Sequence, residues 1–333
     1  MRVFAVGNEL SPSAFLFNNG SRTALFEFWQ QHELDELSLL VAGMLDAPSS
    51  ERLRVFIDDN YDMFEAVDDA TARAFLQSPQ SRQLSYYACV GSVESALLCL
   101  RRLEEARVWI VGVGGIGCHI ADHLVRIGVR KFVLIDFDVV EESNLNRQVL
   151  YRTDDVGRFK VEAAASRLRD IRSEPLDILC YRTFKSDLLL ASHADRPAMI
   201  FVSADAMPFE LRRQVIPAAF HLGVPYAFLG YVGENAAIAP MVLDRSGGCG
   251  SCATAGGKPE EWLWPLARHK ALDIPPSSYA TNAIVAAAAV DLWTRHLIDG
   301  LGGAFDVKVS MRDYSVQKNA AERDPTCPVC GPR

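Results

Sequence analysis

Residues 107–128, RVWIVGVGGIGCHIADHLVRIG, decide the fold. The apolar run RVWIV predicts a buried strand, and the pattern after Gly117 predicts an amphipathic helix. Four glycines, Gly112, Gly114, Gly115 and Gly117, lie between the two. A glycine-rich turn in this position lets a phosphate approach backbone N–H groups at the start of a helix. The stretch therefore predicts a strand-turn-helix unit that binds a nucleotide.

The same alternation of strand and helix continues through the rest of the chain. Strand patterns recur in KFVLIDFD, LDILCYR, AMIFVSAD, VPYAFLGYV, AAIAPMVL and FDVKVSM, with helical patterns between them. An Ala-rich helix is predicted at roughly residues 282–297. Parallel sheets with helices on both faces have this pattern. We therefore predict an α/β fold with a Rossmann-like, mostly parallel sheet over residues 107–333.

Residues 1–80 differ from this pattern and predict a small separate α+β domain. Strand-like MRVFAV, SAFLFNN and RTALFEF, the last two around an Asn-Gly turn signal, are followed by helical patterns. Residues 81–106 are predicted to be a linker that leads into an amphipathic helix. The predicted organisation is thus a domain at 1–80, a linker and helix at 81–106, and the α/β domain at 107–333.

Composition excludes several classes of partner. The 333 residues carry a formal charge of −8 and a pI near 5.4, so the chain has no general attraction for nucleic acid or anionic membranes. The N-terminal residues lack a signal-peptide pattern, and no run of about 18 apolar residues occurs. We expect a cytoplasmic protein with neither a nucleic-acid nor a membrane partner.

A second group of residues discriminates between nucleotides. Asp136 ends the strand after the glycine-rich turn, where a carboxylate can accept hydrogen bonds from a ribose. This fingerprint alone fits a dinucleotide-dependent oxidoreductase equally well. Arg147 and Lys160 add two cations that would neutralise a triphosphate and the charge that develops at its α-phosphorus. A hydride-transfer enzyme does not need them, so the predicted nucleotide is ATP.

Cys249-Gly-Ser-Cys252 and Cys327-Pro-Val-Cys330 are two C-x-x-C pairs. Four thiolates suit a closed tetrahedral zinc site, which has a structural role because no position is left for a substrate. A redox dithiol or unpaired thiols are the alternatives. The remaining cysteines stand among apolar residues and are predicted to be core thiols, with no evident nucleophile for a covalent step: Cys89, Cys99, Cys118 and Cys180.

Four stretches in order, GVGGIG, LIDFDVVEESNLNRQVL, DDVGRFK and VSAD, resemble the adenylation domains of the ThiF, MoeB and ubiquitin-activating families over about residues 82–333. The resemblance implies an enzyme that uses ATP and Mg²⁺. It implies that Asp205 binds the magnesium; the alternative role is an N-cap of the next helix, and both roles could hold together. The nucleotide-binding set that it implies is Gly112, Gly114, Gly115, Gly117, Asp136, Asp138, Ser143, Asn144, Arg147, Gln148 and Lys160.

Arg82, in Ser81-Arg82-Gln83, matches the position from which these families send an arginine across a dimer interface. The resemblance therefore implies a homodimer, which is also the commonest assembly. It implies a catalytic group made of Arg82, Arg147, Lys160 and Asp205.

Further stretches, NRQVLYRTDDVGRFK, FVSADAMPFEL, PYAFLGYVGENAAIAPMVL, GGCGSCA and TCPVCG, look most like the peptide adenylyltransferases of microcin C and pantocin biosynthesis. The resemblance implies that residues 1–80 form a winged-helix-like domain that binds a ribosomally made precursor peptide. The activated carboxylate would be the peptide's C-terminus or a glutamate side chain. Residues 256–278 are predicted to be a crossover loop over the substrate.

Rival functions keep part of this pattern. An enzyme that adenylates the C-terminal Gly-Gly of a ubiquitin-like sulfur carrier would share the adenylation motifs but would not need residues 1–80. A nicotinamide-dependent oxidoreductase would not need Arg147, Lys160 or the cysteine pairs. A non-catalytic binding scaffold would be expected to lose the phosphate-binding residues, which are all present.

Overall fold

The computed structural model describes residues 3–6, 13–17, 64–68, 74, 77–191, 196–204, 208–232, 235–255 and 277–331. The chain divides into two compact units, Met1–Arg101 and Arg102–Arg333. The division falls within residues 81–106, the predicted linker and helix.

In the first unit, three strands form an antiparallel sheet in the order β1-β2-β3. They are β1 (Val3–Val6), β2 (Ser13–Phe17) and β3 (Phe64–Asp68). The first two were predicted, whereas β3 was not. The expected strand at residues 22–28 and the helical patterns before residue 74 lie outside the described residues. Helix α5 (Ser81–Val90) follows, and helix α6 (Val93–Glu105) spans the division between the units. The Ser92 hydroxyl caps α6 by accepting from the Ser95 N–H at 3.0 Å.

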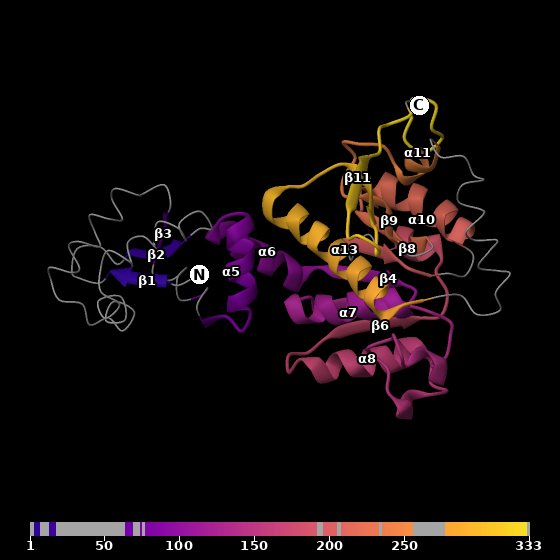
Figure 1. The fold of residues 1–333 in the computed structure, drawn as a ribbon, viewed down its shortest axis with the longest axis horizontal. Helices are drawn as coiled ribbons and strands as arrows, with labels where there is room; N and C mark the ends of the chain where they lie inside the picture. The colour runs from indigo at the N-terminus through magenta and orange to yellow at the C-terminus, as the bar shows by residue number, and fades with distance from the viewer. Residues whose placement is uncertain are drawn as a thin grey trace. The chain divides into compact units, whose positions relative to one another are not determined.

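The second unit contains an eight-stranded sheet in the order β11-β10-β9-β8-β7-β4-β5-β6 (Figure 1). Strands β4 to β8 are parallel, and β9, β10 and β11 extend the sheet by antiparallel pairing. The strands are β4 (Arg107–Val111), β5 (Lys131–Ile135), β6 (Asp177–Tyr181), β7 (Met199–Val202), β8 (Tyr226–Val232), β9 (Asn235–Val242), β10 (Ala304–Val309) and β11 (Val316–Ala320). This mostly parallel α/β sheet confirms the predicted fold class.

Helices cover both faces of this sheet because its strands are apolar on both sides. On one face, Val111, Ile200 and Tyr226 pack with Val215 and Phe220 of α10. On the other, Phe201 meets Trp293 edge to face, with ring centroids 6.2 Å apart. The helices are α7 (Gly115–Ile127), α8 (Lys160–Ile171), α9 (Ser186–Ala191), α10 (Pro208–Leu222), α11 (Gly250–Ala255) and α13 (Tyr279–Asp299), and α13 packs on α7 (Figure 1).

Strand order places the functional edge of the sheet. After β6 the chain crosses to the other side of β4 and forms β7, so β5 and β7 flank β4. Ligands of doubly wound sheets bind outside the carboxyl ends of the strands at such a switch point. Gly112 follows β4, Asp136 follows β5 and Ser203 follows β7, so all three lie at this edge.

Two details differ from the sequence analysis. FDVKVSM, expected to be the last strand, is followed by β11, which pairs with β10. Cys180 is exposed, not a core thiol, because β6 is the edge strand of the sheet, whereas Cys99 and Cys118 are buried as predicted. The Cys89 side chain lies outside the described part of the structure. No described helix is long and apolar enough to cross a membrane.

Candidate nucleotide site

The glycine-rich turn joins β4 to α7 in a tight loop. Gly112 has φ +89°, and its N–H donates to the carbonyl of Ile135 at 2.8 Å. A Cβ on Gly117 would lie 1.9 Å from the carbonyl oxygen of Gly112, so only glycine fits there. The N-cap of α7 is Gly114, which has no side chain to compete for the N–H groups of the first helical turn. Those N–H groups and the helix dipole form an anion site.

A buried pair of donors holds the carbonyl of Val113 in this loop. The Tyr151 hydroxyl donates to it at 2.7 Å and the Cys118 thiol at 3.2 Å. Burial raises the pKa of Tyr151 well above its ordinary value and that of Cys118 to about 12. Both groups therefore stay protonated donors at neutral pH. Cys118 is a structural thiol and not an activated nucleophile.

Asp136 lies beside the loop, as the sequence predicts for a ribose-binding carboxylate. Its oxygens accept the N–H groups of Val113 at 2.7 Å and Asp138 at 2.9 Å. Burial raises the pKa of Asp136, while these two N–H donors oppose the shift. A carboxylate has about four lone-pair sites, so it can accept further hydrogen bonds from a ribose.

Lys160 forms an ion pair with Asp138. Its Nζ lies 2.8 Å from Asp138 Oδ2, and its N–H donates to the Asp138 carbonyl at 3.0 Å. The lysine side chain is 8% exposed and that of Asp138 is 48% exposed. Since Lys160 begins α8 just beyond the carboxyl end of β5, the pair places a nearly buried cation at the nucleotide edge.

Residues 142–151 contact the glycine loop through Gln148 and Tyr151, and they begin with a short 3-10 helix (Glu142–Asn144). Asn144 is buried, and its Oδ1 accepts the N–H of Glu141 at 3.1 Å, so it caps this turn. Ser143 contributes its carbonyl, which accepts from Arg147 Nη1 at 2.7 Å. Arg147 Nη1 also donates to Asn146 Oδ1 at 3.0 Å.

The carboxamide side chains of Gln148 and Asn282 flank the glycine loop. The sequence motifs predicted Gln148 but not Asn282. Gln148 is 5% exposed, and its Nε2 would lie 3.9 Å from a Cβ on Gly114. Asn282 is fully buried on α13, and its Nδ2 would lie 2.2 Å from a Cβ on Gly115. Sequence reasoning missed Asn282, Tyr151 and the His119–Tyr279 ring contact at 4.8 Å, because they come from segments whose patterns indicate ordinary packing.

The structure therefore brings together the four glycines, Asp136, Asp138, Gln148 and Lys160. Asp205 lies outside the described residues, so its role in magnesium binding stays a prediction. Arg82 lies on α5 of the first unit and is exposed; its predicted action on the phosphates also stays a prediction.

The four cysteine sulfurs of the C-x-x-C pairs meet in one cluster. Their Sγ atoms all lie within 4.8 Å of one another. Cys249 Sγ is 3.9 Å from Cys252 Sγ and 3.5 Å from Cys327 Sγ, and Cys252 Sγ is 3.1 Å from Cys330 Sγ. Tetrahedral zinc with bonds of about 2.3 Å separates its sulfurs by roughly 3.8 Å, so the four thiols fit the ion.

Among the four thiols, the surroundings favour the thiolate form of Cys327, whereas burial raises the pKa of Cys249, Cys252 and Cys330. Burial alone would raise the pKa of Cys327, but N–H donors from Cys330 and Val329 outweigh it and hold that pKa at about 7. The cluster fastens the C-terminal residues to α11, and Tyr226 contributes by accepting the Gly250 N–H at 3.2 Å.

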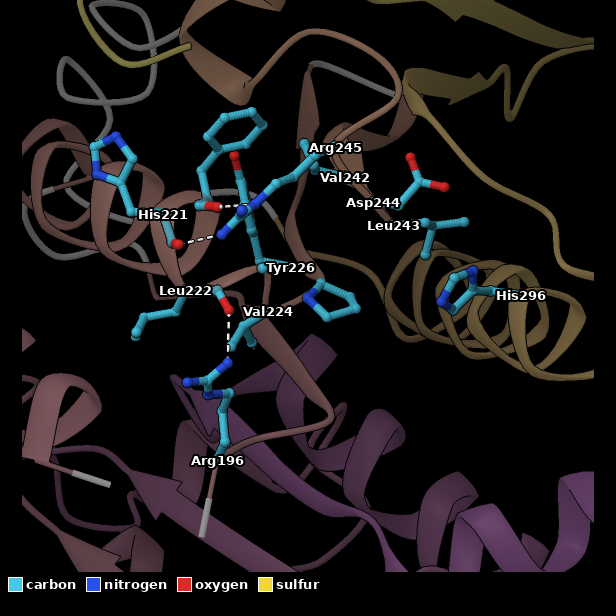
Figure 2. Close-up of a pocket in the computed structure, with 13 residues that line it drawn as sticks. Arg196, His221, Leu222, Val224, Tyr226, Val242, Leu243, Asp244, Arg245 and His296 are labelled. Carbon is cyan, nitrogen blue, oxygen red and sulfur yellow. Dashed lines mark hydrogen bonds between the residues drawn. The ribbon is translucent and has the colours of Figure 1, made fainter. Parts of the chain in front are cut away.

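A cavity of about 730 Å³ lies at the opposite edge of the sheet, where β8 begins and β9 ends. Figure 2 shows Arg196 and Arg245 directed at carbonyl groups of the end of α10. Arg196 Nη1 donates to Leu222 O at 2.9 Å, and Arg245 Nε donates to Phe220 O at 2.7 Å. These arginines stabilise the C-terminus of α10. Because the parallel strand β8 begins at the cavity, the cavity lies at the end of the sheet opposite to the nucleotide edge.

A glycine-rich β-α turn at the switch point of a mostly parallel sheet, with Asp136 and Lys160 beside it, defines a nucleotide-binding α/β protein. The ThiF family model matches residues 81–328, and the chain belongs to the ThiF family.

Relatives and solved structures agree with this assignment. A sulfur carrier protein adenylyltransferase of Thermus thermophilus is 30% identical over 241 residues, which are 69% of this chain and 84% of the relative. An adenylyltransferase and sulfurtransferase uba4 of Neosartorya fischeri is 41% identical over 104 residues, which are 31% of this chain and 21% of the relative. The chain thus matches about a fifth of the length of that fungal protein.

Among solved structures, E. coli MccB with ATP superposes with a TM-score of 0.66 and 24% identity, covering 86% of this chain and 82% of MccB. PaaA superposes with a TM-score of 0.64 and 21% identity, covering 92% of this chain and 99% of PaaA. At these identities the likeness establishes the fold.

Proposed function

We propose that the protein is an ATP-dependent adenylyltransferase that activates a carboxylate of a ribosomally made precursor peptide for the biosynthesis of a peptide natural product. The observation that carries the nucleotide half is the joint placement of the glycine loop, Asp136 and the Lys160–Asp138 pair at one edge of the sheet. The glycine loop supplies N–H donors for the phosphates, Asp136 supplies an acceptor for the ribose, and Lys160 supplies a cation.

The proposed chemistry is acyl-adenylate formation. A carboxylate oxygen attacks the α-phosphorus of ATP, the bond from that phosphorus to the bridging oxygen breaks, and pyrophosphate leaves with the electron pair. Lys160 and Arg147 offset the charge that develops on the phosphates. Mg²⁺, when bound, would neutralise the leaving pyrophosphate, with Asp205 as its proposed ligand.

The proposed peptide substrate is supported by how much of the chain the similar solved structures cover. Likenesses that cover 86% and 92% of this chain extend beyond residues 81–328, which the family model matches. MccB has been solved in complex with N-formylated MccA, which makes a peptide the favoured substrate class. Among the described residues of the first unit, β1 and β3 are the outer strands of the sheet, and an extended peptide can add to such an edge through its backbone.

A second candidate is adenylation of the C-terminal Gly-Gly of a ubiquitin-like sulfur carrier. The observation in its favour is the Thermus thermophilus relative, which is 30% identical and whose name states that activity. That match covers 69% of this chain, whereas the structural likenesses cover more.

ATP–pyrophosphate exchange distinguishes the two functions. The full chain is assayed with peptides encoded beside its gene, each with a free and an amidated C-terminus, and with a carrier ending in Gly-Gly. Exchange with a peptide but not its amidated form identifies the C-terminal carboxylate; exchange with both forms identifies a side chain. Exchange with the carrier and none of the peptides overturns the peptide proposal.

We further propose that the enzyme acts as a homodimer, with Arg82 of one subunit on the phosphates of the other. Arg82→Ala and Lys160→Ala chains would each lose exchange activity, and mixing them would restore up to about a quarter of it, since one site of a mixed dimer is intact. A mixture that forms heterodimers but stays inactive contradicts action in trans. The four-cysteine cluster is proposed to hold a structural zinc ion.

A further inference from the structure

Three buried polar atoms without a hydrogen-bond partner among the described residues surround the first two turns of α7. They are His119 Nε2, Gln148 Oε1 and Asn282 Oδ1. Burying an unpaired polar atom costs about 1–3 kcal/mol, so such atoms are rare in folded proteins. Other buried polar atoms of this kind occur among the described residues, for example at Trp109, Arg130 and Asp306, so what distinguishes these three is their position around the glycine loop.

Asn282 is the most buried of the three. Its side chain is 0% exposed, and its Nδ2 donates to the Ser277 hydroxyl at 3.2 Å. It belongs to the first turn of α13, far along the chain from the glycine loop. Because it is enclosed, Asn282 acts on a ligand through the loop rather than by touching it.

The contact between Asn282 and the loop is close. A Cβ on Gly115 would lie 2.2 Å from Asn282 Nδ2 and 2.9 Å from its Cγ, so the carboxamide rests on the backbone of the first residue of α7. One turn further along, His119 meets Tyr279 with ring centroids 4.8 Å apart. The starts of α7 and α13 are therefore joined at two points, and α13 supports the loop from behind.

The Ser277 hydroxyl can donate or accept, so it can hold the carboxamide in either of its two orientations. This freedom suits a residue that supports a loop in both its empty and its occupied state.

We propose that Asn282 is a positioning residue of the phosphate-binding loop, acting through Gly115 and held by Ser277. The inference rests on the proposed use of ATP. It adds a residue that no motif marks and extends the site to α13.

The test compares ATP with adenosine, which lacks phosphates. Calorimetry on the full chain measures the Kd of both for the unaltered protein, for Asn282→Leu, which is similar in volume, and for Ser277→Ala. Asn282→Leu is expected to weaken ATP about tenfold, the effect of one hydrogen bond, with adenosine affected less than twofold. Ser277→Ala is expected to act in the same direction, and the double variant to be weaker than either by less than the product of the two effects.

Thr294→Val is the matched control. Thr294 is also buried on α13, 3% exposed, but its hydroxyl donates to Asp291 O within the helix at 2.8 Å. Equal losses for ATP and adenosine, or an unchanged Kd for ATP in folded Asn282→Leu, would overturn the inference. If the unaltered protein does not bind ATP, it is the proposed function that fails.

Discussion

Lys160 Nζ and Asp138 Oδ2 lie 2.8 Å apart although 22 positions separate them in the chain. The loop after β5 and the first residue of α8 meet there, and the bond between Lys160 N–H and Asp138 O fixes the same junction. The lysine is nearly buried and its partner is half exposed. The ammonium is thus held at this junction by a carboxylate that stays accessible to solvent.

Replacing Lys160 by Met is expected to lower ATP–pyrophosphate exchange by at least about 100-fold, the usual loss when a group that stabilises transition-state charge is removed. Arg126→Met is the control, because Arg126 pairs with Asp122 on the outer side of α7 at 2.9 Å and is 57% exposed. It is expected to keep full exchange. If Lys160→Met retains exchange within about threefold while folded, Lys160 has no catalytic role.

Replacing Gly117 or Gly115 of the loop by alanine is expected to lower the stability of the fold to different extents. An added methyl group on Gly117 meets the backbone oxygen of Gly112, which has nowhere to move, whereas on Gly115 it meets the side chain of Asn282. Gly117→Ala is expected to destabilise by roughly 3 kcal/mol or more, and Gly115→Ala by about 1–2 kcal/mol.

Urea denaturation measures both changes. Combining Gly115→Ala with Asn282→Ala is expected to restore part of the lost stability, because the second change removes the clash. No second change of this kind is available for Gly117. Gly230→Ala serves as the control, since a Cβ there meets nothing within 4 Å. Equal stabilities for the three alanine variants would contradict the geometry of the loop.

The sequence predicted the parts of the site that lie along one continuous stretch. The glycine turn, Asp136 and Lys160 follow one another at strand and helix ends, and parallel topology brings such ends to one edge. The sequence also predicted that the two C-x-x-C pairs, which begin at Cys249 and Cys327, come together in one cluster. The prediction used their spacing alone, because two such pairs in a reducing compartment are typical of a shared metal ion.

Other parts depend on packing between distant segments, which local patterns do not encode. Asn282 lies in the first turn of the Ala-rich helix predicted at roughly residues 282–297, and nothing in that pattern indicates the loop that it contacts. β11, with its residues VQKNA, is mostly polar and is exposed along its whole length, so it has no alternating pattern to mark it. Cys180 was misplaced because an apolar strand run does not reveal that it lies at the edge of the sheet.

Asp306 on β10 predicts a pH dependence of stability. Burial raises its pKa from 3.8 to about 6, and the positive charge of Arg212 opposes the shift only in part. A raised carboxyl pKa means that the folded state binds the proton more tightly than the unfolded chain. The stabilisation is therefore complete at low pH and is lost as pH rises from about 4 to about 6.

Asp306→Asn removes this titration. Relative to the unaltered protein, the variant should gain stability between pH 4 and pH 6 and keep a constant advantage above that range. Chemical denaturation from pH 4 to pH 8 checks this, with Asp170→Asn on the exposed face of α8 as the control. Parallel profiles for the Asp306 variant and the unaltered protein would show that Asp306 titrates normally in the fold.

The cysteine cluster predicts one zinc ion per chain. Cys252 and Cys330 have sulfurs 3.1 Å apart, too far for a disulfide bond of about 2.05 Å and shorter than the roughly 3.8 Å between two thiolates on one zinc ion. Cys327→Ser is expected to remove the metal and lower the thermal midpoint, because the C-terminal residues lose their attachment to α11. Metal analysis of the purified protein and thermal melting with and without a chelator provide the measurement.

Cys99→Ser, at a buried thiol outside the cluster, should keep its zinc. Unaltered protein that is free of zinc, and whose melting a chelator does not change, would leave the four thiols as a packed cluster without a metal.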